Sequence, residues 1–351
     1  MNIRDNRSRR GVVRTGVLLS AVVLLMTSCQ PDDQTDVILV TELSDDHFIG
    51  VFDDYEVIDG DTFHIRDFTR GFRFLCIDTE EVPRGDDAMQ QLAGLRAAWP
   101  ASYEERRGDK RFPIKMPTPF GYETSEWAKQ WFKDVDSIRL ERDSNDNVFG
   151  YFGRTLAYVY AYKDGEWVNY NVECVRQGGS PYFGKYGFSS RFHDVFEVAQ
   201  EEARYFKRGI WNTDLQHYPD YEERLSWWNA RGASIKRYLG GPAEHDHSYF
   251  IGRDGEFERL ALAGGKEVVV FGPVHWLGDA RPVRTLKLPH KKDLDVRVIL
   301  PDGMQQDVLE QFEQQYIYAR GTVSGGGQEI TITCGSPDDI SRVPHPSWNL
   351  E

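Results

Sequence analysis

Two short stretches of this chain each have the pattern of an apolar strand that ends in clustered carboxylates. The first covers Val57–Thr62 and the second Phe72–Glu81, and the second also carries an arginine at its start. Carboxylate and threonine oxygens from two neighbouring strands are the ligands that a hard cation such as calcium requires. An arginine beside that cation can bind a phosphate through its bidentate fork. The two stretches therefore predict a β-rich fold with a cation and phosphate site where the strands end.

A third stretch, Tyr151–Tyr158, places a second arginine on a turn before another β-rich run. Two carboxylates for a metal, a further glutamate and two arginines form a set of groups that can cleave a phosphodiester. Taken singly, an aspartate after a strand is an ordinary turn residue. The combination on neighbouring strands favours a functional site.

The three stretches resemble the staphylococcal nuclease (thermonuclease) family. In the same order, its members carry an isoleucine-aspartate-glycine-aspartate-threonine strand, an arginine-to-aspartate-threonine-x-glutamate strand and a glycine-arginine-x-leucine-alanine-tyrosine segment. The likeness continues through Asn171–Gly178 and ends with a helix that closes on Gly209–Trp211. It covers residues 47–212, and several ordered matches are more specific than any single motif.

The resemblance implies a metal site with calcium as its cofactor. Asp61 and Asp78 would bind Ca2+ through their side chains, and the backbone carbonyl of Thr79 would supply a third contact. Asp59 would lie behind them and hydrogen-bond a metal-bound water. A simple turn role fits the position of Asp59 equally well.

The resemblance also implies the catalytic groups. Glu81 would activate or orient the attacking water, and Arg73 and Arg154 would stabilise the charge on the phosphoryl oxygens in the transition state. The family usually has proline where this chain has Glu80, so two carboxylates are adjacent here. Because side chains alternate along a strand, the register favours Glu81. Tyr186 is a candidate for lining the nucleotide pocket.

The implied fold is mainly β with α: a five-stranded OB-type barrel with three helices. Thr124 and Ser125 can cap the first of these helices. After a linking helix, five further strands with a helix after the third predict a second, smaller OB-like β-barrel. The expected parts are a lipoprotein signal segment (1–28), a tether (29–46), the nuclease-like domain (47–215), the linking helix (216–242) and the second barrel (243–345).

Residues 82–120 depart from the family pattern. Members need only a short loop after the glutamate, whereas this insertion is long, charged and contains five prolines. Leu92–Trp99 is a candidate short helix, but the insertion holds little apolar material for a core of its own. Long insertions of this kind are usually functional or mobile. Because this one begins directly after Glu81, we expect it to cap the active site and to favour flexible single strands over stiff duplex.

The N-terminus has the pattern of an export signal. Arginines precede an apolar run, Val17–Met26, that is too short to span a bilayer as a mature helix. The small residue before Cys29 resembles the bacterial lipobox, which implies that Cys29 is lipidated and anchors the exported chain to a membrane of the cell envelope. The alternative is an ordinary secretory signal with an incidental cysteine. The arginines fit either a Sec or a twin-arginine route.

The chain is acidic, with a formal net charge of −14. Bulk attraction to nucleic acid is therefore excluded as the binding mechanism, and specific arginines beside a cation must contact the phosphates. The cysteines after Cys29 are Cys76, Cys174 and Cys334, and their spacing does not indicate a zinc site. Buried thiols are the simplest interpretation. A Cys76–Cys174 disulfide stays open, because an exported compartment would permit it.

Together these features predict an exported, calcium-dependent endonuclease that hydrolyses DNA and RNA with little sequence preference and acts most readily on single strands. One alternative is a non-catalytic envelope lipoprotein that binds nucleic acid or protein. Another is an envelope scaffold whose second barrel binds a protein partner while the nuclease is vestigial. Retention of the complete charged motif set favours the enzyme.

Overall fold

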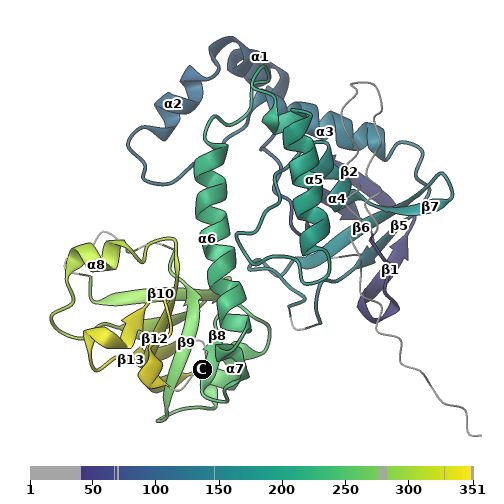
Figure 1. Cartoon of the computed structure of the whole chain (residues 1–351). Helices are drawn as coiled ribbons and strands as arrows, with labels where there is room; N and C mark the ends of the chain where they lie inside the picture. The colour runs from purple at the N-terminus through teal and green to yellow at the C-terminus, as the bar shows by residue number, and fades with distance from the viewer. Residues whose placement is uncertain are drawn as a thin grey trace, which may run out of the picture. The chain divides into compact units, whose positions relative to one another are not determined.

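The computed structural model describes residues 41–66, 68, 71–145, 147–275, 277, 283–327 and 329–348 (Figure 1). The predicted signal segment, Cys29 and most of the predicted tether lie outside these ranges. Within the described ranges, no helix combines the length and the apolar character that crossing a membrane requires. Helices and several largely antiparallel sheets share the chain, which places it in a mixed β/α class.

The first seven strands form a five-stranded sheet and a separate two-stranded ladder. The sheet follows the order β1 (Phe48–Phe52), β5 (Ile138–Glu141), β6 (Thr155–Lys163) and β4 (Phe72–Phe74), and β6 also pairs with β7 (Glu166–Asn169). The ladder consists of β2 (Tyr55–Asp59) and β3 (Thr62–Ile65). This content is consistent with the OB-like fold that the resemblance implies. None of the pairings among the described residues closes the strands into a barrel.

Three helices accompany this sheet: α3 (Pro119–Trp131), α4 (Tyr170–Arg176) and α5 (His193–Tyr205). Thr118 caps α3, because its side chain accepts a hydrogen bond from the N–H of Gly121 at 2.8 Å. Proline at the first helical position favours this start, so the predicted cap at Thr124 or Ser125 was wrong. α4 packs against β6 and α5 against α4 (Figure 1).

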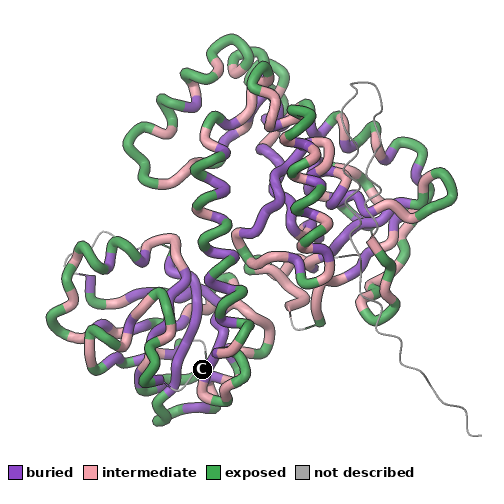
Figure 2. The backbone as a smooth tube through the Cα atoms, in the orientation of Figure 1, coloured by how far each residue is buried: buried purple, intermediate pink, exposed green. Residues whose placement is uncertain are grey.

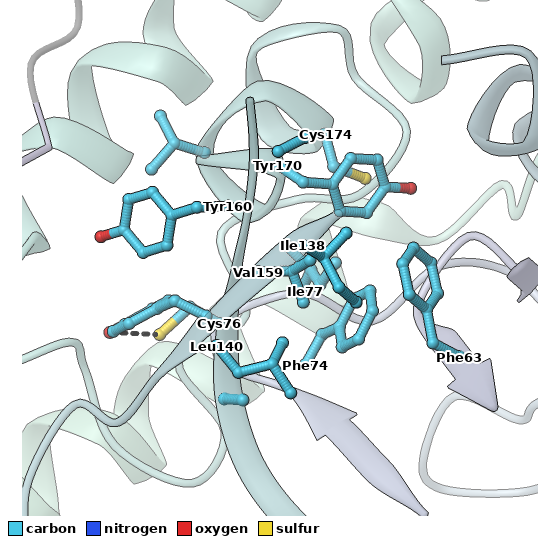
Figure 3. Packing of buried hydrophobic residues seen from close by; sticks show 14 of the residues in the cluster. Phe63, Phe74, Cys76, Ile77, Ile138, Leu140, Val159, Tyr160, Tyr170 and Cys174 are labelled. Carbon is cyan, nitrogen blue, oxygen red and sulfur yellow. Dashed lines mark hydrogen bonds between the residues drawn. The ribbon is translucent and has the colours of Figure 1, made fainter. Parts of the chain in front are cut away.

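The space between the sheet and these helices is filled by aromatic and aliphatic side chains. Figure 3 shows Phe63 and Tyr170 in this cluster, with the sulfur atoms of Cys76 and Cys174 in separate parts of it. These two thiols and Cys334 are buried and free, so the Cys76–Cys174 disulfide that the sequence left open is not formed. Burial raises the pKa of both Cys76 and Cys174, which keeps them protonated and unreactive at neutral pH.

The insertion contains two helices instead of irregular structure. α1 (Ala88–Ala98) is longer than the predicted Leu92–Trp99 helix, and α2 (Ala101–Arg107) follows it. Most residues of α1 are exposed, whereas most residues of β6 and β9 are buried (Figure 2). The insertion is therefore a folded substructure on the surface of the molecule.

A small hydrophobic cluster joins the insertion to the start of the next long helix, α6 (Tyr221–Leu239). The buried members of the cluster come from both parts and from the segment before α6: Tyr103, Met116, Phe120, Ile210, Tyr218 and Tyr221. Arg107 of α2 adds an ion pair with Asp220 at 2.9 Å. The insertion does not form this core alone, because Ile210, Tyr218 and Tyr221 supply the other buried members.

After α6, a second sheet extends over residues 248–341 and is called the C-terminal sheet below. Its strand path is β10-β11-β13-β12-β9-β8, with β14 on β12, and β11 runs parallel to β13. The predicted elements are all present: β9 (Glu267–Pro273), β10 (Thr285–Lys291), β11 (Leu294–Ile299), α8 (Gln306–Glu310), β12 (Tyr316–Gly326) and β13 (Glu329–Thr333). The sheet also includes the short strands β8 (Ser248–Phe250) and β14 (Ile340–Ser341), and α7 (Glu256–Ala261) lies between β8 and β9.

Short 3-10 turns complete the described chain: η1 (Asp45–His47), η2 (Gly209–Trp211), η3 (Pro242–Glu244), η4 (Pro337–Asp339) and η5 (Pro346–Trp348). The C-terminal sheet has its own hydrophobic cluster, distinct from that of the first sheet. As in the first sheet, the pairings among its described residues form an open path.

Candidate functional site

The turn between β2 and β3 presents Asp59 and Asp61. The Asp61 N–H donates to Asp59 Oδ1 at 3.2 Å, which closes the turn. Glycine is required between them, because a Cβ on Gly60 would come within 2.8 Å of Thr79 Cγ2. The Tyr170 hydroxyl donates to the Gly60 carbonyl at 2.8 Å. Tyr170 of α4 and Thr79 therefore hold this turn in place. This turn fixes the carboxylates of Asp59 and Asp61 beside the segment that follows β4.

Arg73 connects the carboxylates of the two motif strands. Its Nη1 donates to Asp61 Oδ2 at 2.9 Å, and its Nη2 donates to Asp78 Oδ1 and, at 3.3 Å, to the carbonyl of Ile77. The Thr79 N–H also donates to Asp61 Oδ2, at 3.0 Å. Burial alone would lower the pKa of Arg73, but Asp61 and Asp78 raise it above its usual value, so Arg73 stays charged.

Asp78 is buried and has a second cationic neighbour. Lys115 of the insertion places its Nζ 2.8 Å from Asp78 Oδ1 and 2.7 Å from Oδ2. The same Nζ lies 3.6 Å from Glu81 Oε1. Burial alone would raise the pKa of Asp78, but Lys115 and Arg73 together lower it to about 2. Asp78 is therefore ionised at any pH near neutrality, and its backbone N–H is fixed by a bond to Ser180 Oγ at 2.8 Å.

The two adjacent glutamates have different surroundings. Glu80 is buried, and its carboxylate accepts hydrogen bonds from three groups, the hydroxyls of Thr118 and Tyr221 and the N–H of Tyr218. Glu81 is partly exposed, and its carboxylate lies near Lys115. Their side chains thus have separate environments, although both residues lie beyond the end of β4 at Phe74, so strand alternation does not account for this. Glu80 connects its segment to Thr118 and to the start of α6, whereas the Glu81 carboxylate is accessible to solvent.

Arg154 lies directly before β6, which pairs with the strand that carries Arg73. β4 and β6 run parallel with Phe72 opposite Thr155, which brings the two arginines to the same side of the sheet pair. Burial and the neighbouring charge of Arg73 lower the pKa of Arg154, while Asp61 partly opposes them. Within the described part of the chain, the Arg154 guanidinium forms no hydrogen bond or ion pair. Among the described residues, its donors are therefore not engaged by a protein group.

Tyr186 lies at the edge of this arrangement, with 59% of its surface exposed. Its ring contacts that of Phe183, with the ring centroids 5.6 Å apart. The ring of Phe183 in turn lies 6.0 Å from the guanidinium carbon of Arg73. The predicted pocket residue is thus connected to the site through Phe183 and does not touch the carboxylates.

Comparisons with known protein families and sequences give two matches. Residues 78–213 match the family model described as staphylococcal nuclease homologue. The chain contains a staphylococcal nuclease homologue domain. A protein of Methanocaldococcus jannaschii that is described as uncharacterized is 24% identical over 161 residues, which cover 45% of this chain and 69% of that protein.

The residues matched to the nuclease homologue family begin at Asp78 and include Glu81 and Arg154. Asp61 and Arg73 precede the matched residues. The structure adds them to the site through the contacts of Arg73 with Asp61 and Asp78. Direct hydrogen bonds therefore join five of the predicted residues into one group: Asp59, Asp61, Arg73, Asp78 and Thr79.

Sequence reasoning missed Lys115. In the chain it is 37 positions from Asp78, inside the insertion that has no counterpart in the family pattern. A β-bridge between Glu81 and Pro117 returns the end of the insertion to the motif strand, and this places Lys115 beside Asp78. The visible signal was a single lysine between two prolines, which does not by itself indicate a site.

The donor set of the nuclease homologue domain suits a hard cation. Asp61 and Asp78 both offer carboxylate oxygens to Arg73. Glu81 adds a third carboxylate, 3.6 Å from the Lys115 Nζ that also contacts Asp78. Oxygen ligands of this kind fit calcium in preference to zinc. Arg73 and Lys115 engage the same oxygens, so a cation that binds here must replace part of their contacts. Arg84 pairs with the supporting carboxylate, Asp59, at 2.7 Å.

Proposed function

We propose that this chain is a calcium-dependent nuclease that hydrolyses phosphodiester bonds of DNA and RNA with little sequence preference. The observation that carries the proposal is the contact of Arg73 with both Asp61 and Asp78, in a domain whose family consists of nuclease hydrolases. An accessible carboxylate, Glu81, and an uncommitted guanidinium, Arg154, lie beside that contact. This set of groups supports phosphoryl transfer more directly than it supports binding alone.

Each group takes one part of the proposed reaction. Asp61 and Asp78 hold the calcium ion, which when bound supplies polarisation of the phosphate. Glu81 accepts a proton from the attacking water or orients that water towards phosphorus. Arg73 and Arg154 donate hydrogen bonds to the phosphoryl oxygens as negative charge builds on them in the transition state.

The net charge of the chain supports a short-range mode of substrate binding. A formal charge of −14 repels a polyanion at a distance, so nucleic acid is not drawn to the surface as a whole. The cations that meet a phosphate at the site are Arg73, Arg154 and Lys115. We therefore propose weak, non-processive binding that depends on these local contacts.

Hydrolysis assays on the purified chain without residues 1–28 test this function. The protein should cleave DNA and RNA with calcium and lose activity in excess chelator. Glu81→Gln and Arg154→Ala should each lower kcat roughly 100- to 1000-fold, because both groups act mainly in the transition state. Glu126→Gln is the control, since Glu126 is an exposed residue of α3 that pairs with Lys129. Undiminished hydrolysis in chelator, or wild-type rates in both active-site variants, would refute the proposal.

We also propose that residues 1–28 direct export and that a lipid on Cys29 anchors the chain to an envelope membrane. The support is the pattern of arginines, short apolar run and small residue before Cys29. Cys29→Ser should move the protein from the membrane fraction to the soluble fraction, since the lipid would be its hydrophobic anchor. A variant that stays membrane-bound would contradict the lipid anchor.

A further inference from the structure

The hairpin that carries Arg154 is short and tightly bonded. It covers residues 148–155 and is called the arginine hairpin below. The Gly150 N–H donates to the Arg154 carbonyl at 2.8 Å, and the Gly153 N–H donates to the Gly150 carbonyl at 2.8 Å. Gly153 has a backbone φ of +74°, a conformation that residues other than glycine rarely adopt. The backbone of Arg154 is thus coupled directly to the first residues of the hairpin.

Residues outside the nuclease homologue domain hold the other side of this hairpin. Asp254, in the turn between β8 and α7, accepts hydrogen bonds on Oδ2 from the N–H of Val148 at 2.7 Å and of Phe149 at 3.1 Å. Lys291, at the end of β10, donates from Nζ to the Phe149 carbonyl at 2.7 Å. The backbone N–H of Lys292 donates to the Tyr151 carbonyl at 3.0 Å. Four hydrogen bonds therefore connect the hairpin to the C-terminal sheet and its turn.

Asp254 and Lys291 are also bonded to each other and to their own surroundings. Lys291 Nζ lies 3.0 Å from Asp254 Oδ1, so Asp254 uses one oxygen for the lysine and the other for the hairpin. Burial alone would raise the pKa of Asp254, but Lys291 and the two hairpin N–H groups outweigh it and lower the pKa below its usual value. The Gly252 N–H donates to His290 Nδ1 at 3.2 Å, which ties the turn to β10. The pair is a pre-organised clamp whose two members each contact the hairpin.

We propose that Asp254 and Lys291 are positioning residues for Arg154. Through the arginine hairpin, they set the place of the guanidinium beside Asp61 and Asp78, so the C-terminal sheet completes the active site. The inference rests on the proposed function, because it assigns the clamp a role in the same reaction. It also gives the C-terminal sheet a task that requires no nucleic-acid contact of its own.

Kinetics of Asp254 variants in the full chain test the clamp. Asp254→Ala should lower kcat roughly 10- to 100-fold with little change in KM, since a displacement of about 1 Å of a catalytic group can cost that much. Asp254→Asn keeps one acceptor oxygen for the hairpin and should recover most of the rate. Asp302→Ala is the matched control: Asp302 forms a 2.9 Å ion pair with Arg284 beside the same sheet and does not contact the hairpin. This control should match the wild type.

A double-mutant cycle separates the clamp from other roles of Asp254. If Asp254 acts through Arg154, adding Asp254→Ala to Arg154→Ala should leave the single-turnover rate unchanged. An equal loss in both backgrounds, or wild-type kcat in Asp254→Ala, would overturn the inference. A slow Arg154→Ala combined with a fast Asp254→Ala refutes only the clamp, and so does wild-type activity in Arg154→Ala alone. Wild-type activity in both Arg154→Ala and Glu81→Gln refutes the proposed function itself.

Hydrogen exchange supplies a readout that does not depend on catalysis. In Asp254→Ala, the amides of Val148 and Phe149 should exchange faster, because each loses its acceptor. Exchange in the core strand β6 of Asp254→Ala should stay as slow as in the wild type. In Asp302→Ala, the exchange rates of the hairpin amides should match those of the wild type. Unchanged protection of the hairpin in Asp254→Ala would show that the clamp does not hold it.

Discussion

Single residues determine how strongly the site attracts a cation, and Asp78 is the clearest case. Its carboxylate is buried and already faces two cationic side chains, Arg73 and Lys115. Arg73 belongs to the motif that resembles the nuclease family, whereas Lys115 comes from the insertion. A divalent cation that binds Asp78 must compete with an ammonium group that the fold holds in place. In the proposed calcium site, the insertion would therefore lower the metal affinity through Lys115.

Lys115→Met should strengthen calcium binding, because it removes this competitor and keeps a side chain of similar length. We expect an increase of about fivefold in affinity, the factor that corresponds to roughly 1 kcal/mol for a partly exposed ion pair. Calorimetric titration of the variant with calcium measures this change without substrate. Lys129→Met is the control: its side chain is 48% exposed, against 46% for Lys115, and it pairs with Glu126 away from the site. Unchanged or weaker calcium binding in Lys115→Met would argue against competition.

At the scale of elements, the end of the second motif strand connects three parts of the chain. Glu80 accepts hydrogen bonds from the cap of α3, Thr118, and from Tyr218 and Tyr221 at the start of α6. All three partners are donors, so the carboxylate acts only as an acceptor. The segment after β4 that carries Asp78 and Glu80 is therefore fixed by both helices.

Glu80→Gln should destabilise the fold even though it keeps the size and removes a buried charge. Burial raises the pKa of Glu80, which favours a neutral group. Glutamine keeps one oxygen for the Tyr218 N–H, but its NH2 replaces an oxygen that accepts from a hydroxyl, so that hydroxyl must turn and accept instead of donate. The exchange of charge-assisted hydrogen bonds for neutral ones costs about 1 kcal/mol. Urea denaturation should show this loss as a lower urea concentration at the midpoint of unfolding. Glu81→Gln is the control, and its midpoint should change little because Glu81 is partly exposed. A variant as stable as the wild type would mean that Glu80 is protonated in the folded chain.

The elements and the motif residues could be predicted because their signals are local. Alternating apolar residues and turn glycines identify the strands of both sheets, and the charged motif residues lie in those strands or within a few residues of them. The start of α3 was missed, since two residue types that cap well stand inside the helix and the true cap precedes a proline. Lys115 and Asp254 could not be predicted. Their roles depend on contacts with Asp78 and Val148 across long separations in the chain, which no local pattern encodes.

At the scale of the whole molecule, the insertion is attached to α6 and reaches the site through Lys115. The hydrophobic cluster that includes Tyr103 and Met116 gives this attachment its apolar part. Arg107 adds the polar part, with an ion pair to Asp220 at 2.9 Å and another to Glu223 at 2.7 Å. Removal of the insertion would expose the cluster on α6. A test of its proposed capping role must therefore loosen the insertion and leave its core in place.

Arg107→Met is suited to this test. We propose that the attached insertion admits flexible single strands more readily than duplex, whose persistence length is about 150 base pairs. Loss of the ion pairs should weaken the attachment by about 1 kcal/mol and reduce the preference for single strands about fivefold. The measurement is the ratio of kcat/KM on single-stranded and duplex DNA of one sequence. Asp220 keeps a partner in Arg224 at 2.6 Å, so no buried charge is left unpaired.

Arg106→Met is the control that separates the loss of positive charge from the loss of attachment to α6. Arg106 is the neighbouring, exposed residue of α2, so its replacement removes the same charge without touching the attachment to α6. If charge near the substrate sets the preference, both variants should change the ratio equally. If the attachment sets it, only Arg107→Met should change it, while a thermal melt shows that both variants remain folded. Equal discrimination by the wild type and Arg107→Met would mean that the insertion does not control access, and that its contribution to the site is confined to the charge of Lys115.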